Sequence, residues 1–383
     1  MTIKELIVNI RVKNIRGEVE QAVTAIHFDS RKVVPGSVFV AVKGRATDGH
    51  KFIDKAVDRG AVCVITEENV DHISEHVCVL TVENSAEVLA KIAGAFYDYP
   101  SRNLTMVGVT GTNGKTTVAT LLFRLFTELG YKCGLLSTIE NRIGDEVEPT
   151  GYTTPDAVAV QETLARMIEA GCTHAFMEVS SHALDQHRVD GIAWDVAIFT
   201  NITHDHLDYH GDFKTYIQAK KIFFDGLSAQ AFALINADDK HAEVMVQNTV
   251  AKVSNYSLTK IADFRARVIE NRIDGLQLEV NGIPLHVRLV GKFNASNLLA
   301  IYGAALLLGE DREQVLTGLS KLQPAEGRFD LVTGSKQVFA VVDYAHTPDA
   351  LHNVLSTLIQ VRQTGSRIIC TVGCGAARPR TKR

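Results

Sequence analysis

The chain has 383 residues, enough for two or three domains of ordinary size. Hydrophobic residues make up 46% of it and charged residues 22%, a balance typical of globular proteins. The net charge of −4 excludes a strongly basic chain that would bind nucleic acid through its overall field. No charged segment followed by a long apolar one opens the chain, so we expect no signal peptide. The longest apolar run, 298–308, is shorter than the about 20 residues that span a bilayer, so we expect no membrane insertion.

The cysteines point to a reducing compartment. The chain has six of them, and none forms a Cys-x-x-Cys pair. Reduced thiols are the simplest interpretation, because disulfides are rare in the cytoplasm. We therefore expect a cytoplasmic protein, and we expect it to be a monomer.

The sequence of residues 1–100 predicts a small α/β domain, and the turn-rich segment 99–103 predicts a linker after it. Short apolar strands alternate there with helical patterns, at 37–42, 52–59, 61–66, 77–82 and 85–96. From Leu104 to about residue 320, strands again alternate with helices, which predicts a mostly parallel sheet covered on both faces. A central domain is therefore expected at 101–327.

The segment 323–328 predicts a second linker, and a third domain is expected at 328–383. Its predicted elements are a strand at 337–343, a helix at 348–363 and a strand at 367–372.

The central domain opens with a candidate phosphate-binding loop. An apolar strand at 104–110 leads into Gly111, Thr112, Asn113, Gly114, Lys115, Thr116 and Thr117, and apolar residues then recur at helical spacing. Main-chain N–H groups at such a helix start bind phosphate oxygens. The Lys115 ammonium would face the β- and γ-phosphates, and the Thr116 hydroxyl could bind Mg²⁺. The general pattern requires glycine at position 109, where this chain has Val109, so a chance glycine turn is the alternative.

Polar clusters follow two further predicted strands. Glu178 ends the strand at 175–179, and His204, His206 and His210 follow the strand at 196–200. Ligands of an open α/β sheet bind beyond the carboxyl ends of its strands, so both clusters should lie on the same edge as the loop. Carboxylate and imidazole groups there could hold Mg²⁺. A solvated loop and a zinc site are the alternatives. Lys220 alone is an ordinary helix lysine.

Together these residues resemble the Mur ligase family, and the resemblance covers essentially the whole chain. The matching segments are DSRKVVPGSVFVAVKG (29–44), DGH (48–50), GTNGKTT (111–117), TTPD (153–156), MEVSSHAL-x-Q-x-R (177–188), FTN-x-THDHLDYHG (199–211), Y-x-x-AK-x-x-x-F (216–224), G-x-FN-x-x-N (291–297), EGR (326–328) and DYAHTPDAL (343–351). TTPD with the 177–188 segment is typical of the members that add the third residue of the peptide.

The resemblance implies a three-domain α/β fold with a uridine-nucleotide domain, a central ATP-binding domain and a Rossmann-like last domain. It implies that ATP phosphorylates the terminal carboxylate of UDP-N-acetylmuramoyl-L-alanyl-D-glutamate, and that the amine of a diamino acid attacks the acyl phosphate. Meso-diaminopimelate is favoured over L-lysine as the commoner family case.

The resemblance also implies roles for single residues. Lys115, Lys220 and His206 match catalytic residues, and Lys220 matches a lysine that CO₂ carbamylates. The Mg²⁺ ligands would be Thr116, Glu178, His206 and the carbamylated Lys220. Asn297, Arg328 and Asp343 match nucleotide contacts beyond the loop. The residues that match contacts of the muramoyl-dipeptide substrate are Ser30, Thr153, Thr154, Ser180, Gln186 and Arg188.

The end of the chain departs from the family pattern. The family's Asp-Asn-Pro-Arg signature is missing, and residues 376–380 differ from the usual sequence before Thr381 returns to register. We therefore expect a chain whose last domain is truncated and whose ligase activity is impaired. A nucleotide-binding fragment without activity is one alternative. A folylpolyglutamate synthase is another, against which TTPD and DYAHTPDAL speak.

Overall fold

The computed structural model describes residues 1–44, 47–334, 338–363 and 365–373. These residues form two compact units, each described here by itself. The first unit comprises Met1–Leu104, Thr154–Ala170 and His182–Ala193, and the second comprises Thr105–Thr153, Gly171–Ser181 and Trp194–Arg383. The expected domain boundaries at 100/101 and 327/328 stay a prediction.

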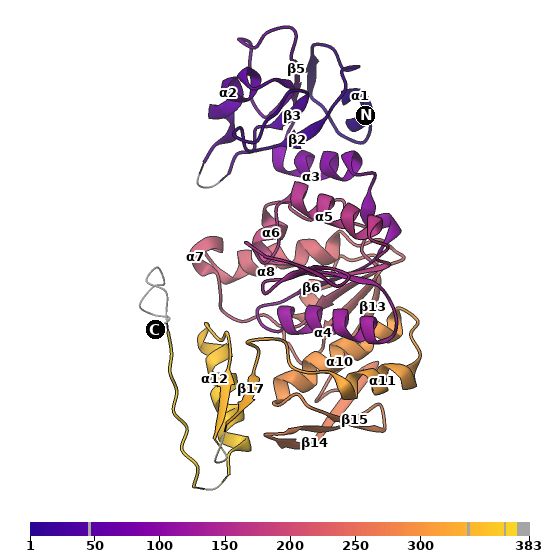
Figure 1. The fold of residues 1–383 in the computed structure, drawn as a ribbon, viewed down its shortest axis with the longest axis vertical. Helices are drawn as coiled ribbons and strands as arrows, with labels where there is room; N and C mark the ends of the chain where they lie inside the picture. The colour runs from indigo at the N-terminus through magenta and orange to yellow at the C-terminus, as the bar shows by residue number, and fades with distance from the viewer. Residues whose placement is uncertain (45–46, 335–337, 364, 374–383) are drawn as a thin grey trace. The chain divides into compact units, whose positions relative to one another are not determined.

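A five-stranded sheet forms the centre of the first unit, in the order β1-β5-β4-β3-β2 (Figure 1). Neighbouring strands are parallel, except that β1 is antiparallel to β5. The strands are β1 (Asn14–Arg16), β2 (Ala25–His27), β3 (Ser37–Val40), β4 (Ala61–Thr66) and β5 (Cys78–Thr81). The last three lie in the predicted ranges. The sequence analysis missed β1 and β2, which have only three residues each.

Both faces of this sheet are buried. Val38 and Val40 of β3 pack in a cluster that includes α3 (Ser85–Phe96), and Phe39 between them packs in a second cluster that includes α2 (Ile53–Asp58). Successive side chains of a strand point to opposite faces, so a continuous apolar run is what a strand covered on both sides requires. The other helices that include residues of this unit are α1 (Ile3–Leu6), η1 (Gly49–Phe52), η2 (Pro100–Asn103), α5 (Ala157–Glu169) and α6 (Ser181–Asp185).

The second unit is built on an 11-stranded sheet, in the order β16-β15-β14-β13-β12-β11-β6-β10-β7-β8-β9. The strands from β14 to β7 in this order are parallel, and antiparallel hairpins extend both edges. The strands are β6 (Thr105–Thr110), β7 (Cys133–Leu136), β8 (Asn141–Ile143), β9 (Glu146–Glu148), β10 (His174–Glu178), β11 (Val196–Phe199), β12 (Phe232–Asn236), β13 (Lys252–Ser257), β14 (Phe264–Arg272), β15 (Gly275–Val280) and β16 (Ile283–Val287).

The two faces of β6 show that the parallel part of this sheet is covered on both sides, as predicted. Val107 and Val109 belong to the large core cluster, to which α4 (Lys115–Glu128), α10 (Lys292–Leu307) and α11 (Arg312–Lys321) contribute. Gly108 faces the other way, where a Cβ atom would lie 2.5 Å from the ring of Phe223. Phe223 belongs to α8 (Phe213–Asp225), so α8 covers the second face. The short helices are α7 (Leu207–His210) and α9 (Ala242–Met245).

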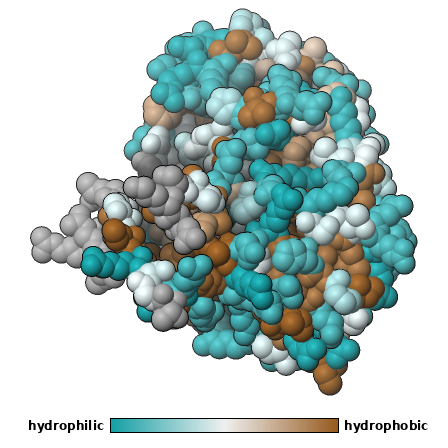
Figure 2. Space-filling view, turned by 60° about the horizontal axis from the view of Figure 1, so that its bottom comes forward, coloured by the Kyte–Doolittle hydropathy of each residue, from teal (hydrophilic) through white to brown (hydrophobic). Residues whose placement is uncertain are grey.

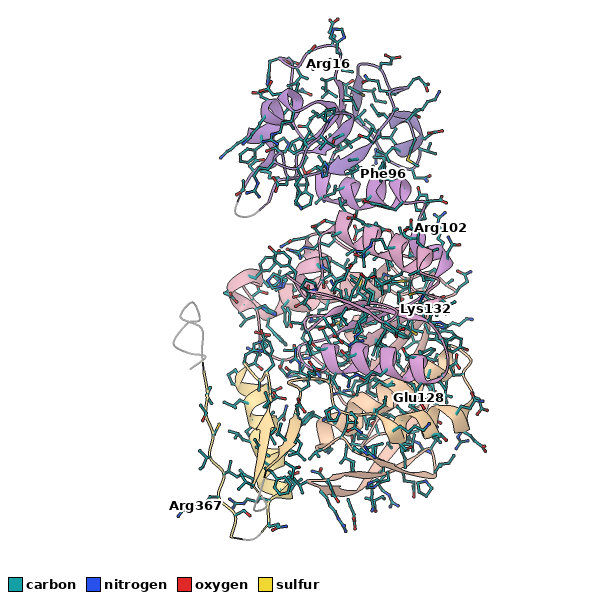
Figure 3. The ribbon with its side chains drawn as sticks, in the orientation of Figure 1. Arg16, Phe96, Arg102, Glu128, Lys132 and Arg367 are labelled. Atoms are coloured by element: carbon teal, nitrogen blue, oxygen red, sulfur yellow. The ribbon has the colours of Figure 1, made fainter. Side chains whose placement is uncertain are left out.

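The packing of α4 against α11 places the two helices on the same side of the sheet. A Cβ atom on Gly318 of α11 would meet a methyl carbon of Leu125 at 2.5 Å, so the glycine allows the close approach. Glu128 at the end of α4, labelled in Figure 3, forms an ion pair with Lys321 of α11. Both side chains of that ion pair are exposed, so it contributes little to stability compared with the buried contact.

The C-terminal segment contains one antiparallel strand pair and one helix. The strands are β17 (Asp330–Thr333) and β18 (Phe339–Val342), and the helix is α12 (Pro348–Val361). The predicted strand at 367–372 is wrong, because these residues pair with no strand and Ile369 is 90% exposed. An apolar run becomes a strand only where a neighbour receives its main-chain hydrogen bonds. The departures from the family pattern at 376–380 lie outside the described residues.

Hydrophobic residues on the face shown in Figure 2 lie between larger hydrophilic areas. Among the helices of the described residues, none is both long enough and apolar enough to cross a membrane.

Candidate functional site

The predicted phosphate loop connects β6 to α4 at the carboxyl edge of the parallel sheet. Val109, where the general pattern has glycine, lies inside β6 and pairs with Glu178 on one side and Ile198 on the other. Its side chain is fully buried. The strand therefore runs to Thr110, the loop begins at Gly111, and no glycine is needed at position 109.

Two glycines are required by the conformation and close contacts of the loop. Gly111 has a φ of +149°, and a Cβ atom there would lie 1.9 Å from the hydroxyl oxygen of Thr200. Gly114 has a φ of +91°, and its Cβ atom would lie 2.6 Å from the side-chain oxygen of Asn297. A side chain at either position would be strained and would also collide with a neighbour.

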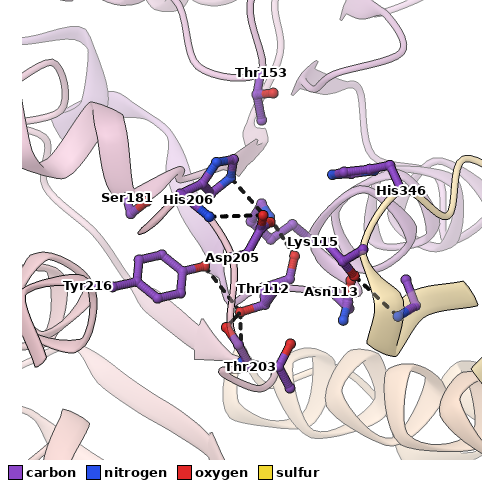
Figure 4. A network of polar contacts seen from close by, with 12 residues as sticks. Thr112, Asn113, Lys115, Thr153, Ser181, Thr203, Asp205, His206, Tyr216 and His346 are labelled. Carbon is purple, nitrogen blue, oxygen red and sulfur yellow. Dashed lines mark hydrogen bonds and ion pairs between the residues drawn. The ribbon is translucent and has the colours of Figure 1, made fainter. Parts of the chain in front are cut away.

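The end of β11 holds the loop from one side. The main-chain N–H groups of Thr112 and Asn113 donate to the main-chain and side-chain oxygens of Asn201, at 2.8 and 3.0 Å. The Thr200 hydroxyl donates to the carbonyl of Asn113 at 2.6 Å. From α8, the Tyr216 hydroxyl lies 3.1 Å from the hydroxyl of Thr112 (Figure 4). The loop is therefore fixed by neighbours on two elements.

Lys115, the first residue of α4, folds back over the loop. Its ammonium donates to the carbonyl oxygens of Gly111 and Thr112, each at 3.0 Å. Burial lowers the pKa of Lys115, the charge of Glu178 opposes this effect, and the charge of Arg328 adds to it. A lysine cation held by the carbonyl oxygens of the loop at the start of a helix suits the binding of phosphate.

Lys220 reaches the same carbonyl oxygen from α8. Its ammonium donates to the carbonyl of Gly111 at 2.9 Å, and the residue is 1% exposed. Burial, and then the charge of Lys115, lower the pKa of Lys220 well below its usual value, while Asp205 acts in the opposite direction. A buried lysine with a lowered pKa holds a larger fraction of neutral amine, which is the nucleophilic form. The structure therefore distinguishes Lys220 from an ordinary helix lysine.

Glu178 ends β10 next to the loop and is fully buried. One carboxylate oxygen accepts a hydrogen bond from the Thr116 hydroxyl at 2.9 Å. The other accepts the main-chain N–H of Thr138, at 2.6 Å. The structure thus brings together two of the predicted magnesium ligands, Thr116 and Glu178, and both offer the oxygen atoms that Mg²⁺ prefers.

The three histidines after β11 do not share a centre. The ring of His204 stacks on Phe213 with centroids 4.6 Å apart, His206 lies 3.4 Å from the carboxylate of Asp205, and His210 lies 3.0 Å from the hydroxyl of the serine that begins α6. The zinc alternative therefore gains no support from these residues. His206 has a φ of +52°, an uncommon conformation that turns its side chain toward Asp205 (Figure 4).

Another group of metal-ligand type lies in the first unit. Within the described ranges, the ligand atoms of Asp48, His50 and Glu68 all lie within 4.8 Å of one another. Nδ1 of His50 lies 2.6 Å from Asp48, and Nε2 accepts the main-chain N–H of Glu67 at 3.1 Å. Both ring nitrogens are thus engaged within the protein, and this group is explained without a metal.

The segment after the second predicted linker reaches the loop. Arg328 donates to the Thr116 hydroxyl at 2.9 Å, and its guanidinium lies 4.8 Å from the ring centre of Tyr344. Asp343 accepts two main-chain N–H groups, each at 2.7 Å, which fixes the turn that follows β18. Arg328 is therefore a contact of the loop, whereas Asp343 shapes the segment that carries it.

Two asparagines complete the surroundings of the loop. Asn297 of α10 donates to Asn294 at 3.2 Å and lies next to Gly114. Asn113 donates its side-chain amide to Asp349, near the start of α12, at 3.0 Å.

Comparison with known families covers most of the chain. Residues 22–97 match the Mur ligase family catalytic domain, residues 109–305 match the Mur ligase middle domain, and residues 327–383 match the glutamate ligase domain of Mur ligases. The chain belongs to the Mur ligase family.

Relatives of this Mur ligase are similar along the whole chain. UDP-N-acetylmuramoyl-L-alanyl-D-glutamate–2,6-diaminopimelate ligases of Cytophaga hutchinsonii and Phocaeicola vulgatus are 52% and 48% identical to it, over 100% of this chain and 79% of theirs. A solved structure with the same ligase name is 30% identical and superimposes with a TM-score of 0.80, covering 100% of this chain and 78% of that one.

The residues that the resemblance assigns to the muramoyl-dipeptide belong to both units of this Mur ligase. Thr153 and Ser180 lie in the second unit, and the other four lie in the first. Within the first unit, Arg188 donates to the carbonyl of Thr154 at 2.8 Å and to the side-chain oxygen of Gln186 at 2.6 Å. These three residues therefore form one group. Ser30, also in the first unit, is 5% exposed.

Three residues that the sequence analysis did not single out lie at the loop or beside its partners. They are Thr138 next to Glu178, Asp205 next to His206, and Asp349 next to Asn113. Thr138 follows the end of a strand and Asp349 is at the start of a helix, so position in the fold was the available signal. Nothing in their spacing along the chain connects them to the loop.

Replacing Lys220 by methionine should remove a pH dependence of folding stability. The pKa of Lys220 in the folded protein lies below its value of about 10.5 in the unfolded chain. At a pH between these two pKa values, the unfolded chain therefore binds more protons than the folded protein. The unfolding free energy of the wild type should therefore rise with pH in that window, by up to about 1.4 kcal/mol per pH unit from this group. Urea titrations in bicarbonate-free buffer between pH 7 and pH 9 measure the slope.

Lys214→Met is the matched control, since Lys214 is an exposed lysine of the same helix. The Lys220→Met variant should show a flatter slope than both the wild type and the control. Equal slopes in all three proteins would contradict the lowered pKa.

Proposed function

We propose that this Mur ligase joins meso-diaminopimelate to UDP-N-acetylmuramoyl-L-alanyl-D-glutamate, converting ATP to ADP and phosphate, as a step in making the peptidoglycan precursor. The main support is that relatives about half identical over the whole chain carry this reaction in their names. The candidate phosphate loop with Lys115 and the buried Lys220 supports the use of ATP. We propose that the protein acts as a monomer in the cytoplasm.

In the reaction, the terminal carboxylate of the D-glutamyl residue attacks the γ-phosphorus of ATP, and the bond to ADP breaks. The amine of diaminopimelate then attacks the acyl carbon, and phosphate leaves. The first step brings two anions together and the second releases phosphate, so positive charge at the loop is needed. Lys115 and Arg328 supply such charge next to Thr116. The other residues of the loop, with Asn297 and Asp343, are proposed to position the nucleotide.

Magnesium fits the residues beside the loop. The buried carboxylate of Glu178 and the hydroxyl of Thr116 are oxygen donors within 2.9 Å of each other. We propose that they hold Mg²⁺ together with His206 and a carbamylated Lys220. Mg²⁺ would neutralise phosphate charge when bound. CO₂ reacts with a neutral amine, and the lowered pKa of Lys220 increases that form.

The sugar-peptide nucleotide is proposed to contact Ser30, Thr153, Thr154, Ser180, Gln186 and Arg188. In this proposal Arg188 pairs with a carboxylate or phosphate of the substrate, because its guanidinium is already oriented by two neighbours.

A ligase assay tests the proposal directly. The purified chain is incubated with ATP, Mg²⁺ and UDP-N-acetylmuramoyl-L-alanyl-D-glutamate, with diaminopimelate, L-lysine or L-glutamate as the amine. Whatever ligase activity this chain retains should give ADP and the tripeptide nucleotide with diaminopimelate. Formation of product only with L-lysine would show that lysine, and not diaminopimelate, is the amino acid added. ADP release only with a folate substrate and glutamate would favour a folylpolyglutamate synthase. Binding of both nucleotides without any product would support the binding-only alternative.

Replacing Lys115 by alanine should weaken ATP binding by a factor of about 100 or more, because it removes the ammonium that faces the phosphates. Isothermal titration calorimetry measures the affinity, and Lys214→Ala serves as a control for loss of an exposed lysine. Affinity of the Lys115→Ala variant equal to that of the wild type would show that the loop does not bind ATP through this residue.

Lys220 should carry a carbamate when Mg²⁺ and bicarbonate are present. ¹³C NMR with labelled bicarbonate should show a carbamate signal in the wild type and none in Lys220→Ala. The same spectrum from both proteins would rule out carbamylation at this position.

A further inference from the structure

Thr138 lies where β7 ends, beside the buried carboxylate of the site. Leu136 of β7 pairs with Met177 of β10, so the residues that follow them leave the sheet side by side. Glu178 follows Met177, and Thr138 comes two residues after Leu136. The parallel register therefore places Thr138 at the carboxyl edge of the sheet, where the ligands of such sheets bind.

The turn that carries Thr138 is held by its own side chains. The hydroxyl of Ser137 donates to the carbonyl of Glu140 at 2.8 Å and accepts the main-chain N–H groups of Ile139 and Glu140, each at 3.3 Å. The side-chain oxygen of Asn141 accepts the main-chain N–H of Ser137 at 3.3 Å. Thr138 is thus presented from a local turn with several hydrogen bonds.

The main-chain N–H and the side-chain hydroxyl of Thr138 donate hydrogen bonds to two different residues. Its main-chain N–H donates to Glu178 at 2.6 Å, and its hydroxyl donates to the hydroxyl oxygen of Thr153 at 3.0 Å. Glu178 is a proposed metal ligand, and Thr153 is a proposed contact of the muramoyl-dipeptide. One residue therefore connects the carboxylate beside the nucleotide loop to the segment that meets the second substrate.

The direction of the second hydrogen bond has a chemical consequence. Because the hydroxyl of Thr138 is the donor, the hydroxyl of Thr153 acts as acceptor and keeps its own proton. Thr153 is only partly buried, and Figure 4 shows it apart from the residues of the loop. Its proton is then available to an oxygen of the substrate, and donation from Thr138 makes it a stronger donor.

We propose that Thr138 is a positioning residue that orients the hydroxyl of Thr153 toward the muramoyl-dipeptide and keeps that hydroxyl at a fixed distance from Glu178. This inference rests on the proposed function. It predicts that the hydroxyl of Thr138 affects binding of the sugar-peptide nucleotide and leaves binding of ATP unchanged, since the main-chain N–H that serves Glu178 is present in any substitution except proline.

The test compares Thr138→Val, which removes the hydroxyl and keeps the branched shape, with Thr138→Ser, which keeps the hydroxyl. Calorimetry measures the affinity for UDP-N-acetylmuramoyl-L-alanyl-D-glutamate and, separately, for ATP with Mg²⁺. We expect Thr138→Val to weaken binding of the sugar-peptide nucleotide about 5- to 10-fold, the effect of one lost hydrogen bond, and Thr138→Ser to restore most of it. ATP affinity should stay the same in both.

Thr127→Val is the matched control, because Thr127 of α4 donates its hydroxyl to the carbonyl of Phe123 within its own helix. A double-mutant cycle with Thr153→Val adds a sharper measure. If Thr138 acts through Thr153, the double variant should bind the sugar-peptide nucleotide about as weakly as Thr153→Val alone. A purely structural role of Thr138 would instead give additive losses or a parallel loss of ATP affinity, and either result would overturn the inference.

The outcomes for the wild type separate this inference from the proposed function. A wild-type chain that binds ATP but not the sugar-peptide nucleotide would overturn the proposed function, and the inference with it. A wild-type chain that binds both, with Thr138→Val unchanged, would overturn the inference alone.

Discussion

The buried carboxylate of Glu178 is the constraint on which the site depends. A carboxylate that is fully buried costs free energy unless donors and cations compensate it. Thr116 and Thr138 each donate to one of its oxygens. The positive charge of Lys115 also interacts favourably with this carboxylate. Lys115 and Thr116 lie at the start of α4, which follows β6, and Thr138 follows β7; these two strands flank β10 in the sheet. The parallel sheet therefore supplies the compensation, and a cation between Glu178 and a phosphate would add to it.

A second constraint is that two lysines share one carbonyl oxygen. Lys115 and Lys220 both donate to Gly111, so each places a positive charge next to the other. Together with burial, this arrangement favours a neutral amine at Lys220. A lysine in that state is suited to become a carbamate, which would turn a repulsive pair of cations into an attractive one. The Thr200 hydroxyl donates to the carbonyls of Thr110 and Asn113, on both sides of Gly111, and so holds the loop around this carbonyl.

The C-terminal segment takes part in the site through side-chain contacts. Arg328 meets the hydroxyl of Thr116, and Asp349 meets the side chain of Asn113. The segment carries exposed apolar residues on its two strands, such as Val332 and Val342. The hydrogen bonds of Arg328 and Asp349 to the loop join side chains only. Contacts of this kind open and close at lower cost than the packed core of the sheet, so this segment is better suited than α4 or α10 to move when substrates bind.

The sequence by itself determined the class of fold, the strand, glycine loop and helix that carry the candidate phosphate loop, and the family. These follow from local order, since an apolar strand, a glycine loop and an amphipathic helix in succession need no distant partner to be recognised. The motif residues could then be named by their match to the family. The predicted strand at 367–372 failed for the opposite reason, because an apolar run is a strand only if another strand pairs with it.

Only the tertiary structure decided which residues act together. Lys220 follows Gly111 by more than one hundred positions, and its lowered pKa arises from burial against that loop. The three histidines after β11 are close in sequence, yet His204 stacks on Phe213 while His206 and His210 lie against Tyr216. Thr138 has no sequence feature that marks it, and it gains its place from the register of β7 with β10. Burial and strand register are properties of the assembled sheet, and for this reason residue spacing did not reveal them.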